Sequence, residues 1–195
     1  MKRTWLLLLG GACLGSLAVL LLEQKLAPQI QAQQQQAQER RLLDLLPPEY
    51  YNNHPLQNPI ALAAGGLLGL SRPSYGYIAR YNEQPVAWLI PVEAKGYAGP
   101  ILLLVAIAPN GSILSSKILH QQETPGLGER LRPERSPWLK QFEQKSLQDP
   151  WLLRVDGGVI DQISGATITS RATTDALQRV LRYYNSHAGS WEAND

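Results

Sequence analysis

The sequence predicts an α+β fold, rich in antiparallel strands with flanking helices and preceded by one N-terminal transmembrane helix. Three observations support this prediction. Residues 5–22 form an uncharged, mostly apolar run. Residues 75–119 contain short apolar segments that are separated by turn sequences, which is typical of paired strands. Residues 170–184 carry apolar side chains at helical spacing.

Composition limits the chemistry that the chain can perform. Its 195 residues include 18 Lys and Arg against 16 Asp and Glu, and the net charge is only +2. No nucleic-acid partner is expected, because there is no long basic run. Cys13 is the only cysteine and the three histidines lie far apart in sequence, so we expect no internal disulfide, no iron–sulfur cluster and no metal site. Redox chemistry would need an organic cofactor.

The apolar run at residues 5–22 is long enough to cross a membrane, since a helix rises about 1.5 Å per residue and the hydrocarbon core is roughly 30 Å thick. A cleaved signal peptide would have a shorter apolar region. A lipoprotein signal ending at Cys13 would be followed by polar residues, whereas residues 14–22 remain apolar. We therefore expect an uncleaved anchor. Lys2 and Arg3 favour a cytoplasmic N-terminus, with the rest of the chain on the other side.

Residues 23–48 predict a stalk. Gln, Ala, Glu, Arg and Leu favour a helix, and Pro47-Pro48 would end it. A disordered linker is the alternative. Four leucines near the end of this segment are expected to pack on the following domain: Leu42, Leu43, Leu45 and Leu46. The apolar run at residues 60–70 is too short to span a bilayer as a helix, and its structure is left open.

Four strands follow, at residues 75–81, 86–92, 101–108 and 112–119. The first two flank the turn sequence N-E-Q-P at residues 82–85. The last two are separated by Asn110-Gly111, which is a strong hairpin signal. This pattern predicts antiparallel pairing.

Two helices and a further strand are predicted in the last third of the chain. Ser136-Pro137 is typical of a helix start and predicts a helix from about Trp138 to Lys145. Residues 151–155 predict a strand, and residues 156–158 a turn. A final helix is expected near residues 170–184, with Ser170 as its cap. Its apolar face would comprise Ala172, Ala176, Leu177, Val180, Leu181 and Tyr184.

Two glycine-containing stretches are candidates for a binding site. In G-Y-A-G, residues 96–99, glycine would allow the backbone to approach a ligand closely, and Tyr97 offers a flat contact. In E-T-P-G-L-G, residues 123–128, Pro-Gly sets a turn. The adjacent Glu123 and Thr124 could hydrogen-bond a polar heterocycle. Taken alone, each stretch is also explained as a surface loop.

A third stretch, D-Q-I-S-G-A-T-I-T-S at residues 161–170, crowds hydroxyl groups beside Gly-Ala just before the final helix. A turn with a helix cap is the simpler interpretation. Ser164 does not lie in a G-x-S-x-G elbow, because Gln162 occupies the place of the first glycine, and this argues against hydrolysis. Backbone N–H groups at a helix start attract anions, although the lysine of a phosphate-binding P-loop is missing. An unusual kind of phosphate binding is therefore favoured.

The S-G-A-T sequence, with an aspartate three residues before its serine, resembles the flavinylation motif of FMN-binding domains in the Rnf and sodium-translocating NADH:quinone oxidoreductase complexes. In these families the threonine after the alanine is esterified to the phosphate of FMN, which implies covalent FMN at Thr167. The E-T-P-G-L-G and G-Y-A-G stretches are similar to elements of the same families. The order of the three motifs, together with the anchor, resembles the G subunit of the Rnf electron transport complex.

The resemblance implies a set of cofactor-binding residues around this threonine. Ser164, Thr169 and nearby N–H groups would hydrogen-bond the phosphate oxygens. One departure concerns a histidine that family members often carry two positions before the glutamate, because Gln121 stands there and His120 lies one place earlier. The full set is Thr167, Ser164, Gly165, Ala166, Thr169, Asp161, Glu123, Thr124, Gly126, Leu127, Gly96 and Tyr97.

The resemblance also implies an organisation and a role for the whole chain. The segments would be a cytoplasmic N-terminus at 1–4, a transmembrane helix at 5–22, a stalk at 23–48, an FMN-binding domain at 49–186 and a C-terminal tail at 187–195. The chain would carry electrons on the periplasmic side of a bacterial inner membrane. Its partners would be membrane lipid, other membrane and redox subunits, and a flavin transferase during maturation.

Two alternatives remain open from the sequence. The first is the equivalent FMN subunit of a sodium-translocating NADH:quinone oxidoreductase. The second is a structural subunit without flavin. In no case is the chain expected to be an independent enzyme, because the flavin would perform the redox step within a larger complex.

Overall fold

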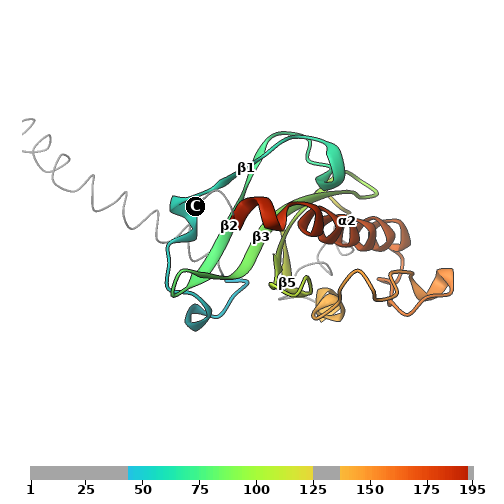
Figure 1. The fold of residues 1–195 in the computed structure, drawn as a ribbon. Helices are drawn as coiled ribbons and strands as arrows, with labels where there is room; N and C mark the ends of the chain where they lie inside the picture. Colours follow the sequence, from blue (N-terminus) through green and yellow to red (C-terminus); the bar gives the residue numbers. More distant parts are fainter. Residues whose placement is uncertain (1–43, 125–136, 193–195) are drawn as a thin grey trace, which may run out of the picture. The chain divides into compact units, whose positions relative to one another are not determined.

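The computed structural model describes residues 44–124 and 137–192 of the chain. The chain divides into two compact units, Met1–Asp44 and Leu45–Asp195, and the elements labelled in Figure 1 lie in the second unit. The predicted transmembrane helix and most of the predicted stalk lie outside the described residues. Within the described ranges, no helix is both long enough and apolar enough to cross a membrane.

Five strands form one antiparallel sheet, in which each strand pairs with its neighbour in sequence (Figure 1). The four predicted strands are confirmed. The additional strand, β1, lies in the run at residues 60–70 whose structure the sequence left open. The strands are β1 Ile60–Leu62, β2 Ser74–Tyr81, β3 Gln84–Lys95, β4 Pro100–Ile107 and β5 Ile113–His120.

The hairpin between β2 and β3 turns at Asn82 and Glu83, which have φ values of 49° and 68°. A two-residue loop with positive φ at both positions is a type I′ turn, whose twist matches that of the strands it joins. The predicted turn is therefore confirmed at these two residues. Gln84 and Pro85 already belong to β3, where they pair with Tyr81 and Arg80.

Replacing Glu83 by glycine should stabilise this hairpin. A residue with a Cβ pays roughly 1–2 kcal/mol in the left-handed region, whereas glycine adopts it freely. Part of that gain is offset because glycine has more freedom in the unfolded chain. We expect Glu83→Gly to raise the free energy of unfolding by about 0.5–1 kcal/mol in urea titrations of the protein. Glu83→Ala keeps the Cβ and should show no gain, and an equal gain in both variants would contradict the backbone explanation.

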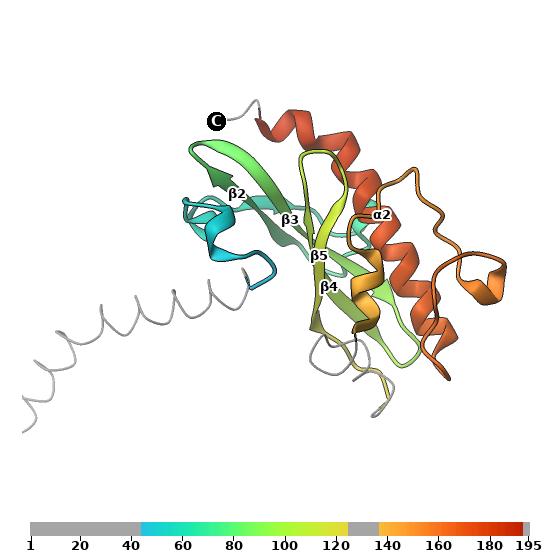
Figure 2. The ribbon, with the colours of Figure 1, turned by 90° about the horizontal axis from the view of Figure 1, so that it is seen from below.

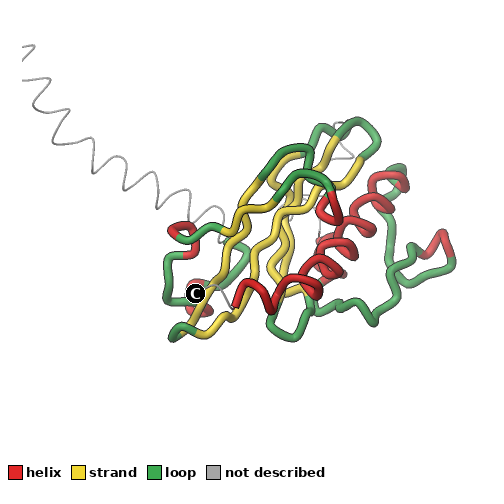
Figure 3. Tube along the Cα trace, turned by 45° about the horizontal axis from the view of Figure 1, so that its top comes forward, coloured by secondary structure: helices red, strands yellow, loops and turns green. Residues whose placement is uncertain are grey.

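One long α-helix, α2, lies across one face of the sheet and contacts β3 and β4 (Figures 2 and 3). It spans Thr167–Glu192, so it begins three residues before the predicted start and includes residues 187–192. The prediction of Ser170 as the cap is wrong. Ser170 is fully buried inside the first turn, where its Oγ donates to the carbonyl oxygen of Ala166 and accepts the N–H of Ile163, both at 2.9 Å.

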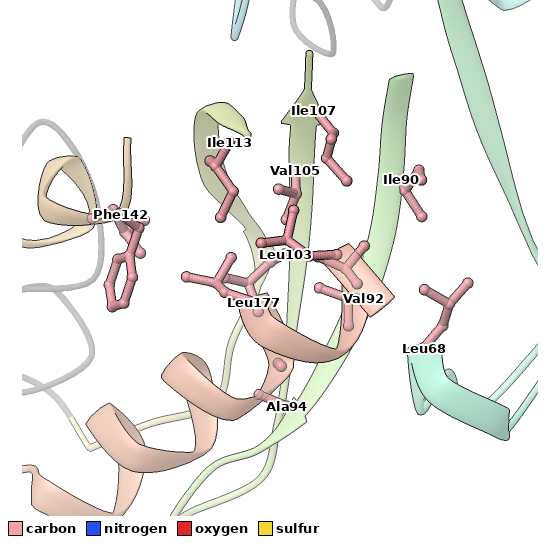
Figure 4. Packing of buried hydrophobic residues seen from close by; sticks show 14 of the residues in the cluster. Leu68, Ile90, Val92, Ala94, Leu103, Val105, Ile107, Ile113, Phe142 and Leu177 are labelled. Atoms are coloured by element: carbon pink, nitrogen blue, oxygen red, sulfur yellow. The ribbon is translucent and has the colours of Figure 1, made fainter. Parts of the chain in front are cut away.

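The hydrophobic core fills the space between the sheet and α2. Figure 4 shows side chains of β3, β4 and β5 directed toward Leu177 of α2, with Leu68 of η3 (Gly66–Leu68) at the side. Arg179 of α2 fixes this flank, because its guanidinium donates to the carbonyl oxygens of Leu67 and Glu93. The run at residues 60–70 therefore comprises the strand β1, which pairs with β2, and the 3-10 helix η3, which lies against α2.

Residues 44–59, which precede β1, contain no long helix or strand. Residues Pro48–Tyr50 and Pro55–Gln57 form the short 3-10 helices η1 and η2. Leu46 is buried, as expected for the end of the predicted stalk. Beside it, the carbonyl oxygen of Leu45 accepts a 2.6 Å hydrogen bond from Ser115 Oγ of β5. Leu42 and Leu43 lie outside the described residues.

The predicted helix at residues 138–145 and the predicted strand at residues 151–155 differ from the structure. The predicted helix at 138–145 is the 3-10 helix η5, Pro137–Phe142, which lies beside β5 (Figure 2). It ends early because the backbones of Gln144 and Lys145 bond to Ile113 at the start of β5. The predicted strand at 151–155 is an isolated bridge between Leu153 and Ile160, followed by the 3-10 helix η6, Arg154–Asp156. Gly157 then ends η6, as the predicted turn requires.

Candidate functional site

A cavity of about 490 Å³ lies at the start of α2. Its volume is in the range of small-molecule sites, which is roughly 300–1,000 Å³. Residues from all three predicted stretches line it: Tyr97, Glu123, Thr124, Gly165, Ala166, Thr167, Ile168 and Thr169. Stretches that are far apart in sequence thus meet at one site.

The turn before α2 determines where Thr167 lies. Gly165 has a φ of 80°, in the left-handed region that favours glycine, and the N–H of Ala166 donates to the carbonyl oxygen of Ile163 at 2.9 Å. The chain turns here and enters the helix with Thr167 as its first residue, half-buried at the cavity. The N–H groups of a first helical turn have no intrahelical acceptor, and the helix dipole is positive there. This geometry suits an anionic group such as phosphate.

Glu123 connects the three stretches. Its side chain is buried, and its Oε2 accepts a 2.6 Å hydrogen bond from the hydroxyl of Thr169 in α2. Its Oε1 accepts the N–H of Ala98 in the G-Y-A-G stretch at 3.1 Å. Gln121 completes the arrangement, because its Oε1 accepts the N–H of Glu123 at 2.6 Å. The carboxylate thus joins the G-Y-A-G stretch to the first turn of α2.

Gly96 lies against the Glu123 carboxylate. A Cβ at this position would overlap the Glu123 Oε1 atom, and it would lie 2.7 Å from Ile101 Cδ1 and 2.8 Å from the carbonyl oxygen of Gly99. The close approach that requires glycine is therefore made with the Glu123 carboxylate. Tyr97, the next residue, is 72 % exposed at the rim of the cavity, where its ring is available to a flat ligand.

Several predicted site residues are not among the described residues that line the cavity. The carboxylate of Asp161 pairs with Arg154 at 2.7 Å, and Ser164 is exposed in the turn before α2. Gly96 also falls outside the lining, although it shapes the site through Glu123. Gly126 and Leu127 lie outside the described residues.

The displaced histidine does not reach this site. His120 lines a different cavity of about 420 Å³, together with Arg72 and Glu93 among others. Its Nε2 lies 3.5 Å from Nε2 of Gln122. A role for this histidine at the cavity beside Thr167 is therefore not supported.

Ile168 is a lining residue that was not among the predicted site residues. Its side chain is 53 % exposed beside Thr167. The sequence does contain a signal, because Ile168 is out of phase with the buried apolar face of the final helix. An apolar side chain that faces away from the core in a helix's first turn can contact a ligand instead.

Arg171, one turn after Thr167, is already paired with a carboxylate. Arg171 forms a two-point contact with Asp156, at 2.7 and 3.0 Å, and hydrogen bonding from this guanidinium lowers the pKa of the Asp156 carboxyl. None of the residues that line the described cavity is a lysine or an arginine. The donors that the described residues offer to a phosphate are therefore neutral N–H and O–H groups. In the described ranges, no three His, Cys, Asp or Glu side chains gather as a metal site.

Comparison with known proteins agrees with these features. Residues 96–182 match the FMN-binding domain family, a span that includes every residue lining the cavity. The G subunit of the ion-translocating oxidoreductase complex of Pseudomonas aeruginosa is 41% identical over 192 residues, covering 96% of this chain and 90% of that protein. The protein of the same name from Vibrio cholerae is 38% identical over 191 residues, covering 95% and 91%.

The fold also has a solved counterpart. The crystal structure of Shewanella oneidensis NqrC superposes with a TM-score of 0.52, at 18% sequence identity, over 80% of this chain and 74% of that one. At this identity the similarity shows the fold alone, an FMN-binding domain fold with a five-stranded antiparallel sheet and a C-terminal helix. The two G subunits resemble this chain over nearly its whole length. The chain belongs to the family of G subunits of the ion-translocating oxidoreductase complex.

Proposed function

We propose that this chain is a membrane-anchored flavoprotein subunit of an Rnf-type ion-translocating complex, and that it carries electrons through an FMN joined by a phosphoester to Thr167. The observation that carries the proposal is the position of Thr167 at a helix start, on a cavity lined by residues of all three motifs. The relatives' designation as subunits of an ion-translocating oxidoreductase complex supports the role.

The residues at the cavity fit this group. FMN, when bound, supplies reversible electron transfer, and the protein supplies position and environment. The N–H groups at the start of α2 would bond the phosphate oxygens. Tyr97 and Ile168 would contact the flat ring system, and the exposed hydroxyl of Thr124 would bond a polar edge.

A covalent bond would reduce the negative charge that the site has to hold. A free FMN phosphate carries a charge close to −2 at pH 7. Its ester with threonine is a phosphodiester with a single negative charge. Neutral N–H and O–H donors at a helix start can stabilise that smaller charge more fully. The tether also keeps the flavin at a high local concentration.

Ester formation needs an activated flavin donor. The Thr167 oxygen would bond to the flavin phosphorus and lose its proton. The bond from that phosphorus to a leaving group would break, and the leaving group would keep the bonding electrons. A flavin phosphoanhydride, such as a flavin dinucleotide, provides a nucleotide phosphate as this leaving group, and a flavin transferase would catalyse the step. No electrons are gained or lost by the protein.

We further propose the organisation that the sequence predicts. Residues 5–22 would anchor the chain in the inner membrane and contact lipid, residues 23–48 would form the stalk, and residues 49–186 would form the flavin domain on the periplasmic side. Other membrane and redox subunits would exchange electrons with it. Identities of 41% and 38% to the two G subunits favour this assignment over the quinone-reductase alternative.

A direct test is to produce the chain with a flavin transferase, denature it, and locate the flavin by gel fluorescence and peptide mass spectrometry. Trypsin cleavage after Arg154 and Arg171 yields the peptide 155–171, which includes Thr167 and three other hydroxyl residues. We expect fragmentation to place a phosphoryl-flavin on Thr167. Flavin on another residue would overturn the assignment. A protein that stays flavin-free with an active transferase would support the structural subunit instead.

A further inference from the structure

We propose that Glu123 is a positioning residue, whose contact with Thr169 fixes the first turn of α2 so that the Thr167 hydroxyl faces the site of ester formation. This inference rests on the proposed function. It assigns Glu123 a role different from the expected one, in which its carboxylate binds the flavin directly.

The contacts of the carboxylate carry the proposal. Glu123 is 8 % exposed, and each of its oxygens already has a protein donor: Thr169 Oγ1 at 2.6 Å and the Ala98 N–H at 3.1 Å. A carboxylate that is removed from water needs such donors, and losing one of them is costly. Both contacts use Glu123 as an acceptor. Phosphate oxygens are acceptors too, so this side chain is suited to protein donors and not to the phosphate.

The contact also determines the orientation of the helix start. Thr169 is 2 % exposed and lies two residues after Thr167 in the same helical turn. Because successive residues of an α-helix are related by a fixed rotation, holding the Thr169 side chain fixes the direction of the Thr167 side chain. The opposite end of the contact is the loop at residues 96–99, where Gly96 leaves room for the carboxylate.

The partners are distant in sequence, so the contact is a tertiary one. Glu123 lies 25 residues from Ala98 and 46 residues from Thr169. The 2.6 Å bond to Thr169 connects α2 to a residue outside the helix. Removing it should leave the helix intact while freeing the start of the helix to move.

The test measures the rate at which a flavin transferase loads the full chain with a flavin dinucleotide as donor. Glu123→Gln removes one acceptor position, and Thr169→Val removes the donor at nearly constant volume. Small displacements of reacting groups cost up to about a hundredfold in rate, so we expect at least ~10-fold slower loading in both variants. Thr169→Ser keeps the hydroxyl and should restore loading to within about threefold of the wild type, which a role in packing alone would not explain.

The double variant separates positioning from direct flavin contact. If Glu123 acts through Thr169, Glu123→Gln combined with Thr169→Val should be no slower than the slower single variant, to within about twofold. Additive losses would overturn the proposal, and so would wild-type rates in both single variants. Glu93→Gln is the matched control, because Glu93 also accepts two hydrogen bonds, from Ser71, but lies outside the lining of this cavity.

A second measurement does not depend on flavin. Amide hydrogen exchange in the unloaded protein should accelerate at Ser170, whose N–H donates to the carbonyl oxygen of Ala166, in Glu123→Gln and Thr169→Val, but not in Thr169→Ser or Glu93→Gln. Unchanged exchange in the first two variants would overturn the positioning role, even if the wild type accepts no flavin. Loss of the proposed function would instead appear as a wild type that is not loaded at Thr167. The two failures are therefore distinguishable.

Discussion

Thr167→Val is expected to carry no covalent flavin after production with an active transferase. Valine has nearly the shape of threonine but no oxygen, so the phosphoester cannot form. The denatured band should lose all flavin fluorescence, while the wild-type band retains it. Thr167→Ser keeps an oxygen at the helix start and should be loaded, more slowly because serine populates more rotamers than the branched threonine side chain.

The fold should survive this change, which makes the result interpretable. Thr167 is half-buried, and its side chain is not part of the hydrophobic core. We expect Thr167→Val to alter the free energy of unfolding by no more than about 0.5 kcal/mol, measured by urea titration. Ser190→Ala, which removes an exposed hydroxyl near the other end of α2, is the matched control and should be fully loaded. Flavin retained by a folded Thr167→Val protein would contradict the attachment site.

The sheet could be predicted because its signals are local. Apolar segments bounded by Asn82-Glu83 and Asn110-Gly111 specify strands and hairpins within a few residues of each other. The start of α2 is predicted too late because Ser170 resembles a cap. In the structure its hydroxyl lies in the buried first turn, where it accepts the N–H of Ile163 and donates to the carbonyl oxygen of Ala166. The side-chain type indicates a hydrogen bond with the backbone but does not identify the partners.

The predicted strand at 151–155 is wrong for a related reason. Trp151 and Leu153 are buried and alternate with the exposed Leu152, which imitates a strand. No neighbouring strand pairs with them in the described ranges, and burial is provided by an aromatic cluster instead. An alternating pattern of apolar residues indicates which side chains are buried, but it does not show that the backbone pairs with a neighbouring strand.

Part of the cavity lining was predictable from short motifs, whereas the contacts of the lining residues were not. Short motifs identified Thr167, Thr124 and Tyr97, all of which line the cavity. The use of Glu123 as an internal acceptor depends on residues 25 and 46 positions away, and no local pattern records such a contact. Tertiary contacts therefore determine which motif residues are available to a ligand and which form hydrogen bonds within the protein.

Phe142→Ala is expected to cause the largest loss of stability among the changes considered. Phe142 is the only phenylalanine of the chain and is fully buried. Its ring lies edge-on to Trp138, with centroids 5.2 Å apart, and stacks on Trp151 at 6.0 Å. Deleting a buried phenylalanine ring leaves a cavity and typically costs about 3–5 kcal/mol. That is a large part of the roughly 5–15 kcal/mol that stabilises a domain.

Urea titration monitored by circular dichroism should therefore show a much lower midpoint for Phe142→Ala. Leu152→Ala is the matched control, because Leu152 lies next to Trp151 but is 59 % exposed. This variant should lower the free energy of unfolding by no more than about 0.5 kcal/mol. Equal losses in the two variants would contradict the burial argument. The folded fraction of Phe142→Ala should still be loaded at the wild-type rate, because the Glu123–Thr169 contact at the first turn of α2 does not involve the ring of Phe142. Slower loading of that fraction would show that the cluster also positions the helix start.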